Sequence, residues 1–161
     1  AHVTACDIHP HRLDLIRAYA EKSKVELNIV AQDATLFNPM FENKFDCILV
    51  DAPCSGIGVL SKRKDIIFNR KESDIQELAK LQLSILNNSK AYLKEGGILI
   101  YSTCTMLKRE NEEVIEQFLS KNNNFVLQTI ADLPYNNNGM LQFLPDGKGM
   151  DGFFIARMVK K

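Results

Sequence analysis

The stretch Phe45-Asp46-Cys47-Ile48-Leu49-Val50-Asp51-Ala52-Pro53-Cys54 decides the fold class of this chain. Its apolar run is nearly continuous, which is typical of a strand covered on both faces in a parallel sheet. We expect this strand over 45–50, ending at Asp51. Ligands of open α/β sheets bind beyond the carboxyl ends of the strands. The acid and the thiol that follow the strand are therefore candidate site residues.

The alternation of strands and helices continues on both sides of this stretch. Apolar residues at helical spacing predict helices from Pro10 to Ala20, from Ile75 to Leu93 and from Glu112 to Leu119. Further strands are predicted at 3–7, 25–31, 98–102, 125–129 and 153–159, and a loop over the Asn- and Gly-rich residues 134–152. Alternating βα units imply an α/β fold with a mostly parallel, doubly wound sheet and helices on both faces. Neither a repeat nor a linker interrupts residues 1–161, so we expect a single domain.

The composition excludes several classes of protein. Of the 161 residues, 45% are apolar and 25% charged, which is typical of a globular domain and not of a disordered chain. No apolar run reaches the roughly 18 residues of a membrane span. The formal net charge is zero, so any nucleic-acid binding must come from a local basic patch. We expect no secretory leader, reduced thiols and a cytoplasmic protein.

Three acids stand at predicted strand ends. Asp7, Asp33 and Asp51 each close an apolar run, and an acid in this position commonly accepts hydrogen bonds from ribose hydroxyls. Asp7 is the candidate for the ribose, Asp33 for the adenine amino group of a nucleoside, and Asp51 stands at the same edge. Helix-capping or turn acids are the alternative for Asp7 and Asp33.

Four cysteines occupy positions 6, 47, 54 and 104, with no Cys-x-x-Cys pair and no histidine at metal-ligand spacing, so we expect no metal. Cys6 and Cys47 lie within apolar strand patterns and are predicted to be buried structural residues. Cys54 and Cys104 each follow a strand, on the edge to which the acids also point. Either could be a small buried residue, but the pair favours catalysis.

The flanks of these two cysteines carry a family resemblance. Asp51-Ala52-Pro53-Cys54-Ser55-Gly56 and Tyr101-Ser102-Thr103-Cys104-Thr105 are similar to the paired motifs of RNA cytosine-5 methyltransferases, and the similarity is greatest to the bacterial 16S ribosomal enzymes of the Sun or Fmu branch. Asp65-Ile66, Asn111-Glu112 and Asp151-Gly152-Phe153-Phe154 extend the resemblance over the chain. It implies a Rossmann-like methyltransferase fold with S-adenosylmethionine as cofactor.

The resemblance also implies roles for the motif residues. Cys104 would add its thiolate to carbon 6 of cytosine, which makes carbon 5 nucleophilic, and Cys54 would help to release the methylated base. Asp51, beside both cysteines, would stabilise charge that develops at the ring nitrogen.

The expected RNA partner is ribosomal RNA, with transfer RNA left open. Lys62, Arg63, Lys64 and Arg70 lie just after the first cysteine motif, and Lys108 and Arg109 just after the second. A basic rim of this kind supplies phosphate contacts, although ordinary solvated lysines give the same pattern. The target base has to be unstacked to reach the cysteines.

Family members carry a strand and an Ala-Pro-Gly-Gly-Lys-type loop before the position of Ala1. We therefore expect these residues to be a fragment that lacks the first strand and the glycine-rich loop, binds cofactor weakly or not at all alone, and could self-associate through exposed strand edges. The alternative function is a non-catalytic RNA-binding or assembly module, which would not need two thiols. A nucleotide-binding oxidoreductase is disfavoured because no Gly-x-Gly-x-x-Gly stretch occurs.

Overall fold

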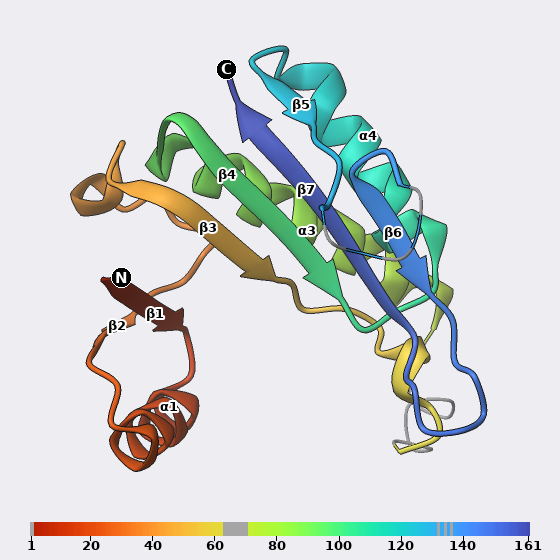
Figure 1. Cartoon of the computed structure of the whole chain (residues 1–161), viewed down its shortest axis with the longest axis horizontal. Helices are drawn as coiled ribbons and strands as arrows, with labels where there is room; N and C mark the ends of the chain where they lie inside the picture. The colour runs from red at the N-terminus through yellow and green to blue at the C-terminus, as the bar shows by residue number, and fades with distance from the viewer. Residues whose placement is uncertain (1, 63–70, 132, 134, 136) are drawn as a thin grey trace. The chain divides into compact units, whose positions relative to one another are not determined.

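The computed structural model describes residues 2–62, 71–131, 133, 135 and 137–161. The chain divides into two compact units, residues 1–38 and 39–161 (Figure 1). Each unit has its own sheet and is described by itself. The predicted single domain over 1–161 stays a prediction.

The smaller unit is one βαβ motif. Strands β1 (Val3–Asp7) and β2 (Leu27–Ala31) are parallel and in register from Val3 opposite Leu27 to Asp7 opposite Ala31. Helix α1 (Pro10–Ser23) connects them and begins at Pro10, as predicted, because proline suits the first helical turn. The carboxyl ends of both strands therefore lie at one edge, where Asp7 and Asp33 follow.

The larger unit is built around a five-stranded sheet. Its strand order is β3-β4-β7-β5, and β6 also pairs with β7. Its strands are β3 (Phe45–Asp51), β4 (Leu93–Thr103), β5 (Phe125–Leu127), β6 (Met140–Phe143) and β7 (Phe153–Lys160). Its helices are α3 (Glu72–Tyr92) and α4 (Glu112–Lys121), with short 3-10 turns η1 (Pro39–Phe41), η2 (Ile57–Val59) and η3 (Lys108–Glu110).

The strand directions refine the expected topology. β3 and β4 are parallel, as the βα pattern predicts, whereas β7 is antiparallel to each of its partners β4, β5 and β6. This sheet is therefore mixed. Among the described residues β1 pairs only with β2 and β3 only with β4. An additional strand along either free edge stays a prediction.

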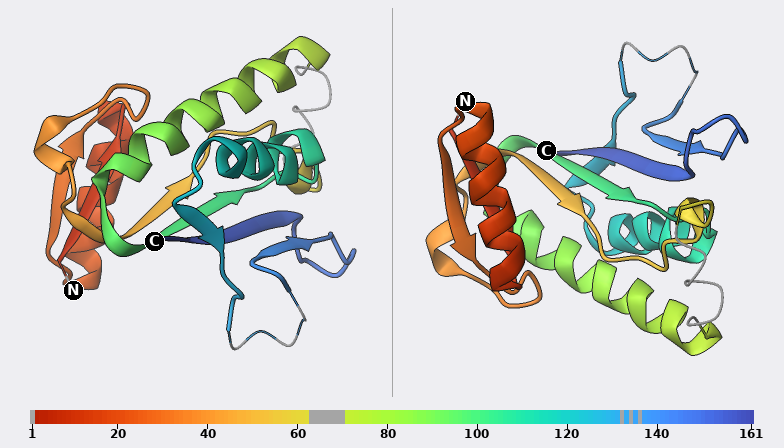
Figure 2. Two further views of the ribbon diagram at one scale, coloured as in Figure 1. Left: turned by 90° about the horizontal axis from the view of Figure 1, so that it is seen from above. Right: turned by 90° about the horizontal axis from the view of Figure 1, so that it is seen from below.

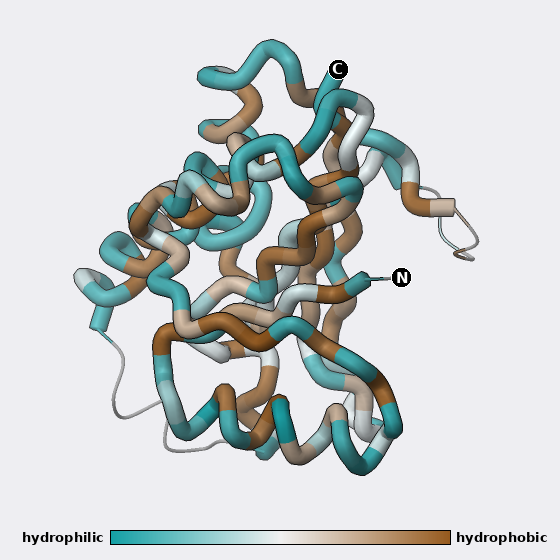
Figure 3. The backbone as a smooth tube through the Cα atoms, turned by 90° about the vertical axis from the view of Figure 1, so that its left-hand side faces the viewer, coloured by the Kyte–Doolittle hydropathy of each residue, from teal (hydrophilic) through white to brown (hydrophobic). Residues whose placement is uncertain are grey.

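The core of the larger unit lies between its sheet and the two helices, which share one face of the sheet (Figure 1, Figure 2). From Phe154 onward, strand β7 alternates between buried and half-buried side chains, as a strand with one covered face does. Apolar and hydrophilic stretches alternate along the backbone (Figure 3). The residues with less than 2% exposure include Leu86, Leu93, Leu99, Tyr101, Ile115, Phe118, Phe154 and Met158.

Three local expectations were wrong. The predicted loop over 134–152 contains β6, a short strand that forms only by pairing with β7. β4 begins at Leu93 and not at Ile98, because an irregularity at Gly96, with φ +74, joins the two parts of the strand. Cys6 and Cys47 are exposed and not buried, because an apolar run does not show whether both faces of its strand are covered.

Candidate active site

The two cysteine loops leave neighbouring parallel strands at the same end. Asp51, the last residue of β3, stands opposite Ser102 of β4, and the backbone N–H of Ala52 donates to the carbonyl of Ser102 at 2.9 Å. The ladder thus continues one residue beyond β3. The loops that carry Cys54 and Cys104 therefore start side by side, as their position after strands predicted.

The thiols of Cys54 and Cys104 meet between these loops. Their Sγ atoms are 3.3 Å apart, within hydrogen-bonding distance, although 50 positions separate them in sequence. Both side chains are half-buried and neither forms a disulfide. A half-buried pair of free thiols at a sheet edge has the partial solvent access that reactive cysteines need.

The two thiols differ in acidity. The pKa of Cys104 is lowered to about 7, chiefly because the Cys54 thiol donates a hydrogen bond that stabilises the Cys104 thiolate. The same hydrogen bond, together with burial, raises the pKa of Cys54. Cys104 is therefore the more acidic thiol of the pair near neutral pH, and Cys54 stays protonated beside it.

Asp51 completes the group of three residues that the sequence predicted. Its Oδ1 accepts a hydrogen bond from the Ser102 hydroxyl at 2.9 Å. Its charge opposes ionisation of Cys104 and so limits how far the pKa of that thiol falls. The side chain is exposed, so its carboxylate can also meet a ligand at this edge.

Close backbone contacts fix the Cys104 loop against η2 and the start of β7. The N–H of Gly58 donates to the carbonyl of Cys104 at 2.9 Å, and the N–H of Gly152 donates to the carbonyl of Gly58 at 2.8 Å. A Cβ atom on Gly58 would lie 2.3 Å from the Gly152 carbonyl oxygen and 2.7 Å from that of Cys104. Only glycine permits this approach.

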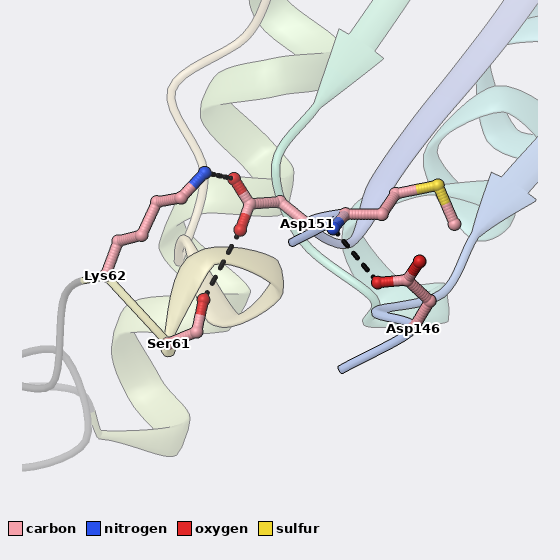
Figure 4. Close-up of polar contacts among 5 residues, drawn as sticks. Ser61, Lys62, Asp146 and Asp151 are labelled. Carbon is pink, nitrogen blue, oxygen red and sulfur yellow. Dashed lines mark hydrogen bonds and ion pairs between the residues drawn. The ribbon is translucent and has the colours of Figure 1, made fainter. Parts of the chain in front are cut away.

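The basic residues predicted to bind RNA are only partly described. Arg63, Lys64 and Arg70 lie outside the described residues. The Nζ of Lys62 is 2.5 Å from Oδ2 of Asp151, whose Oδ1 accepts from Ser61 at 3.4 Å (Figure 4). The Lys62 side chain remains 64% exposed, so a phosphate can still reach it.

The turn before Asp151 is held by another acid. The Oδ1 of Asp146 accepts from the backbone N–H groups of Lys148 and Met150 at 2.8 and 3.0 Å, and the contact with Met150 is drawn in Figure 4. These hydrogen bonds lower the pKa of Asp146. The turn therefore presents Asp151 to Ser61 and Lys62 on a preformed backbone.

Asp7 and Asp33 lie in the smaller unit. Oδ1 of Asp7 accepts from the N–H of His9 at 2.8 Å, and Oδ2 is 3.5 Å from the Arg12 guanidinium. Oδ1 of Asp33 accepts from the N–H and the hydroxyl of Thr35 at 2.8 and 2.6 Å, which lowers the pKa of Asp33. Both acids stabilise local turns. In each acid the hydrogen bond from the backbone N–H goes to Oδ1, so Oδ2 takes no part in it.

Sequence reasoning missed a set of buried polar residues behind the cysteine loops. The fully buried members are Ser55, Gln82, Thr103, Thr105, Glu110 and Asn111. Glu110 ends the charged run Lys108-Arg109-Glu110, which is typical of a solvated surface. A local signal was the polar Asn111, which directly precedes the predicted helix that begins at Glu112.

Two further structural findings bear on the class of site. Within the described ranges, His, Cys, Asp and Glu side chains do not gather in threes at a possible metal site. None of the described helices combines the length and apolar character that a membrane crossing requires.

Comparison with solved structures defines the class of protein. NSun6 from Pyrococcus horikoshii, solved with SFG, matches 99% of this chain with a TM-score of 0.83 at 27% identity, over 41% of its own chain. A methyltransferase homologue from Pyrococcus horikoshii matches 100% of this chain with a TM-score of 0.81 at 28% identity, over 54% of its own chain. The fold is that of the Rossmann-like, S-adenosylmethionine-dependent methyltransferases.

Sequence comparison defines the family. Residues 1–159 match the family described as 16S rRNA methyltransferase RsmB/F, and this chain belongs to that family. It is 40% identical to the probable ribosomal RNA small subunit methyltransferase B of Bacillus subtilis, covering 99% of this chain and 38% of that protein. It is 35% identical to ribosomal RNA small subunit methyltransferase B of Shewanella oneidensis, covering 97% of this chain and 37% of that protein. The resemblance seen in the cysteine motifs is thereby confirmed, and the chain spans less than two fifths of these relatives.

Proposed function

We propose that the protein containing this chain transfers a methyl group from S-adenosylmethionine to carbon 5 of a cytosine in small-subunit ribosomal RNA. The observation that carries the proposal is the Cys54–Cys104 pair, with its 3.3 Å separation and its unequal acidity. Carbon 5 of cytosine is too weak a nucleophile to react unaided. A thiolate beside a second thiol meets that chemical need.

The first step belongs to Cys104. Its thiolate adds to carbon 6 of the ring, a carbon–sulfur bond forms, and the electron pair of the 5,6 double bond moves toward carbon 5 and the ring nitrogen. With a pKa of about 7, a large fraction of Cys104 is ionised at neutral pH without assistance from a separate base. Cys104 therefore needs only a correctly placed cytosine.

Asp51 and Cys54 serve the remaining steps. The Asp51 carboxyl group, held by Ser102 beside both thiols, stabilises charge at the ring nitrogen while carbon 5 becomes nucleophilic. Carbon 5 would take the methyl group as the methyl–sulfur bond of the cofactor breaks, which leaves S-adenosylhomocysteine. The carbon-5 proton would then pass to a water molecule, the 5,6 double bond would re-form, and the carbon–sulfur bond would break to release Cys104 as a thiolate. The Cys54 thiol donates its hydrogen bond to that leaving thiolate and favours release.

The residues present suit part of the cofactor. When bound, S-adenosylmethionine supplies an electrophilic methyl group on sulfur. Asp7 and Asp33 stand at the carboxyl edge of β1 and β2, each with an oxygen outside its turn hydrogen bond, so each can accept from a nucleoside hydroxyl or amino group. No Ala-Pro-Gly-Gly-Lys stretch occurs in these residues to hold the methionine end.

The RNA side of the proposal rests on the ribosomal names of the relatives and on the exposed Lys62 beside the cysteine loops. Arg63, Lys64 and Arg70 follow Lys62 in sequence and extend its positive charge. These cations would bind phosphates, while the cysteines act on a base that has left its stack.

Covalent trapping tests the proposal. The intact protein and its Cys54→Ala, Cys104→Ala and Cys47→Ala variants are incubated with cofactor and either 16S ribosomal RNA or transfer RNA, then run on a denaturing gel. We expect a protein–RNA adduct to accumulate with Cys54→Ala on ribosomal RNA and to be missing with Cys104→Ala. Cys47 is the matched control, because its exposed thiol lies on β3 outside the pair.

Each other outcome has a clear meaning. An adduct that persists in Cys104→Ala would contradict the assignment of the nucleophile. Adducts on transfer RNA alone would contradict the ribosomal substrate while keeping the chemistry. RNA binding without an adduct in any variant would favour a non-catalytic binding module.

A further inference from the structure

Two consecutive residues at the start of α4 contact the flanks of both catalytic loops. Glu110 ends η3, and Asn111 directly precedes α4. Both side chains are fully buried although both are polar, and one is an acid. Burying a charge is unfavourable unless hydrogen bonds compensate it, so the partners of Glu110 show what it does.

Glu110 holds the loop of Cys54. Its Oε1 accepts from the backbone N–H of Ser55 at 2.8 Å, and its Oε2 accepts from the Ser55 hydroxyl at 2.5 Å. Gln82 of α3 donates from Nε2 to Oε1 of Glu110 at 3.0 Å and to the carbonyl of Pro53 at 2.9 Å. The residues on either side of Cys54 are thus fixed, one directly by Glu110 and the other through Gln82.

Asn111 holds the loop of Cys104 in the same way. Its Oδ1 accepts from the hydroxyl of Thr103 at 2.6 Å, and its Nδ2 donates to the carbonyl of Thr105 at 3.0 Å. Nδ2 also donates to Oε1 of Gln142 in β6 at 2.9 Å. Both neighbours of Cys104 are therefore fixed by one amide side chain.

The two halves of this arrangement are joined. The hydroxyls of Ser55 and Thr105 are 2.9 Å apart, so the loops are also linked to each other. The hydroxyl of Tyr101 donates to the carbonyl of Glu110 at 2.6 Å and fixes the backbone that carries the pair. Because Glu110 and Asn111 are adjacent, any movement of one loop relative to the other must strain this short segment.

We propose that Glu110 and Asn111 are positioning residues that together set the separation of Cys54 and Cys104. This inference rests on the proposed function for its catalytic meaning. Reacting groups have to be held within about 1 Å of their productive geometry, and such a misplacement typically costs about a hundredfold in rate. A buried acid and a buried amide that each fix one cysteine loop provide that accuracy.

The charge of Glu110 and the loop contacts of Glu110 and Asn111 affect the pKa of Cys104 in opposite directions, so the two effects can be measured separately. The groups that act on it are the Cys54 thiol, which favours the thiolate, and the carboxylates of Asp51 and Glu110, which oppose it. Tyr101, in β4, stays neutral because burial raises its pKa. Removing the charge of Glu110 while keeping its shape therefore lowers the pKa of Cys104, whereas releasing the loops removes the Cys54 hydrogen bond and raises it.

The experiment compares Glu110→Gln, Glu110→Ala, Asn111→Ala and the control Glu116→Gln in the intact protein. Glu116 lies on α4, the helix that follows Glu110 and Asn111, and is exposed, so its substitution removes the same charge outside the site. Iodoacetamide labelling of Cys104 is followed by mass spectrometry as a function of pH, and adduct formation is measured on a Cys54→Ala background. Circular dichroism shows whether each variant is folded.

We expect the pH midpoint of Cys104 labelling to fall below the wild-type value in Glu110→Gln and to rise above it in Asn111→Ala. Adduct formation falls about a hundredfold in both alanine variants and less in Glu110→Gln, since glutamine keeps an acceptor for Ser55. Unchanged midpoints, or adducts at the reference rate in the alanine variants, would overturn the inference. If the alanine variants do not fold, the adduct rate of Glu110→Gln decides the question, because one of the two oxygens that accept from Ser55 is then replaced by a donor. A rate equal to that of the reference would overturn the inference.

Failure of the proposed function is distinguishable from failure of this inference. If the Cys54→Ala reference forms no RNA adduct, the proposed reaction is contradicted. The labelling midpoints still report whether Glu110 and Asn111 control the thiol pair, because labelling requires neither RNA nor cofactor.

Discussion

Replacing Cys54 by alanine should make Cys104 a much weaker nucleophile at neutral pH. The hydrogen bond from Cys54 is the largest influence that lowers the pKa of Cys104 from the ordinary 9.0 to about 7. Burial and the charges of Asp51 and Glu110 act in the opposite direction. Once the donor is removed, the pKa of Cys104 should return to at least its ordinary value.

The size of the effect follows from the fraction of thiolate. At pH 7 a thiol with the wild-type pKa is roughly half ionised, whereas one at the ordinary value is about 1% ionised, so labelling should slow about fiftyfold. Thiolate increases with pH in both proteins, so the difference should shrink as the pH rises toward 9. Adducts with Cys54→Ala should therefore form slowly at pH 7 and accumulate because release is impaired.

The assay is the initial rate of iodoacetamide labelling of Cys104, measured from pH 5 to 10 by mass spectrometry of its peptide. Cys47→Ala serves as the control for removing a thiol outside the pair. In this variant the pH midpoint of Cys104 labelling should equal that of the wild type. A midpoint that stays near 7 in Cys54→Ala would refute the reasoning, because the hydrogen bond would then not be the cause of the acidity.

Two further predictions concern the glycine contact and the cofactor. Gly58→Ala places a methyl group 2.3 Å from the Gly152 carbonyl oxygen, so the free energy of unfolding should fall by about 1–3 kcal/mol, measured by urea denaturation. An unchanged unfolding midpoint would mean that the loops move apart at little cost. Asp33→Asn keeps an acceptor for Thr35 but replaces the other oxygen with a donor, so S-adenosylmethionine should bind at least about tenfold more weakly in calorimetry of the intact protein. Equal affinity, or an equal loss in the exposed Asp14→Asn, would argue against a role for Asp33.

The sequence was most informative where a signal is local. The strand that ends at Asp51 and the thiols of Cys54 and Cys104 were predictable, because apolar runs and the residues that follow them are read within a few positions. The parallel pairing of β3 with β4 followed from the same pattern. The structure then brought Asp51, Cys54 and Cys104 together as expected, while their catalytic roles stay predictions.

What sequence reasoning missed depends on tertiary contacts. Cys47 was expected to be buried but is exposed. The expectation failed because an apolar run does not show how many faces of its strand are covered. The four residues of β6 gain their strand conformation from β7 and not from their own propensity. Glu110 follows two basic residues and looked like surface, and only the closure of the fold reveals that it is buried behind Ser55.

The position of β7 has a consequence for how the site is assembled during synthesis. β7 is the last strand in sequence order, yet it lies between β4 and β5 and also pairs with β6. Gly152, which bonds the carbonyl of Gly58, directly precedes β7, so this part of the support behind the Cys104 loop forms only after residues 152–160 have left the ribosome. Contacts this distant in sequence form late because the intervening chain must first be ordered. The contact between Gly58 and Gly152 is thus among the last supports of the site to form.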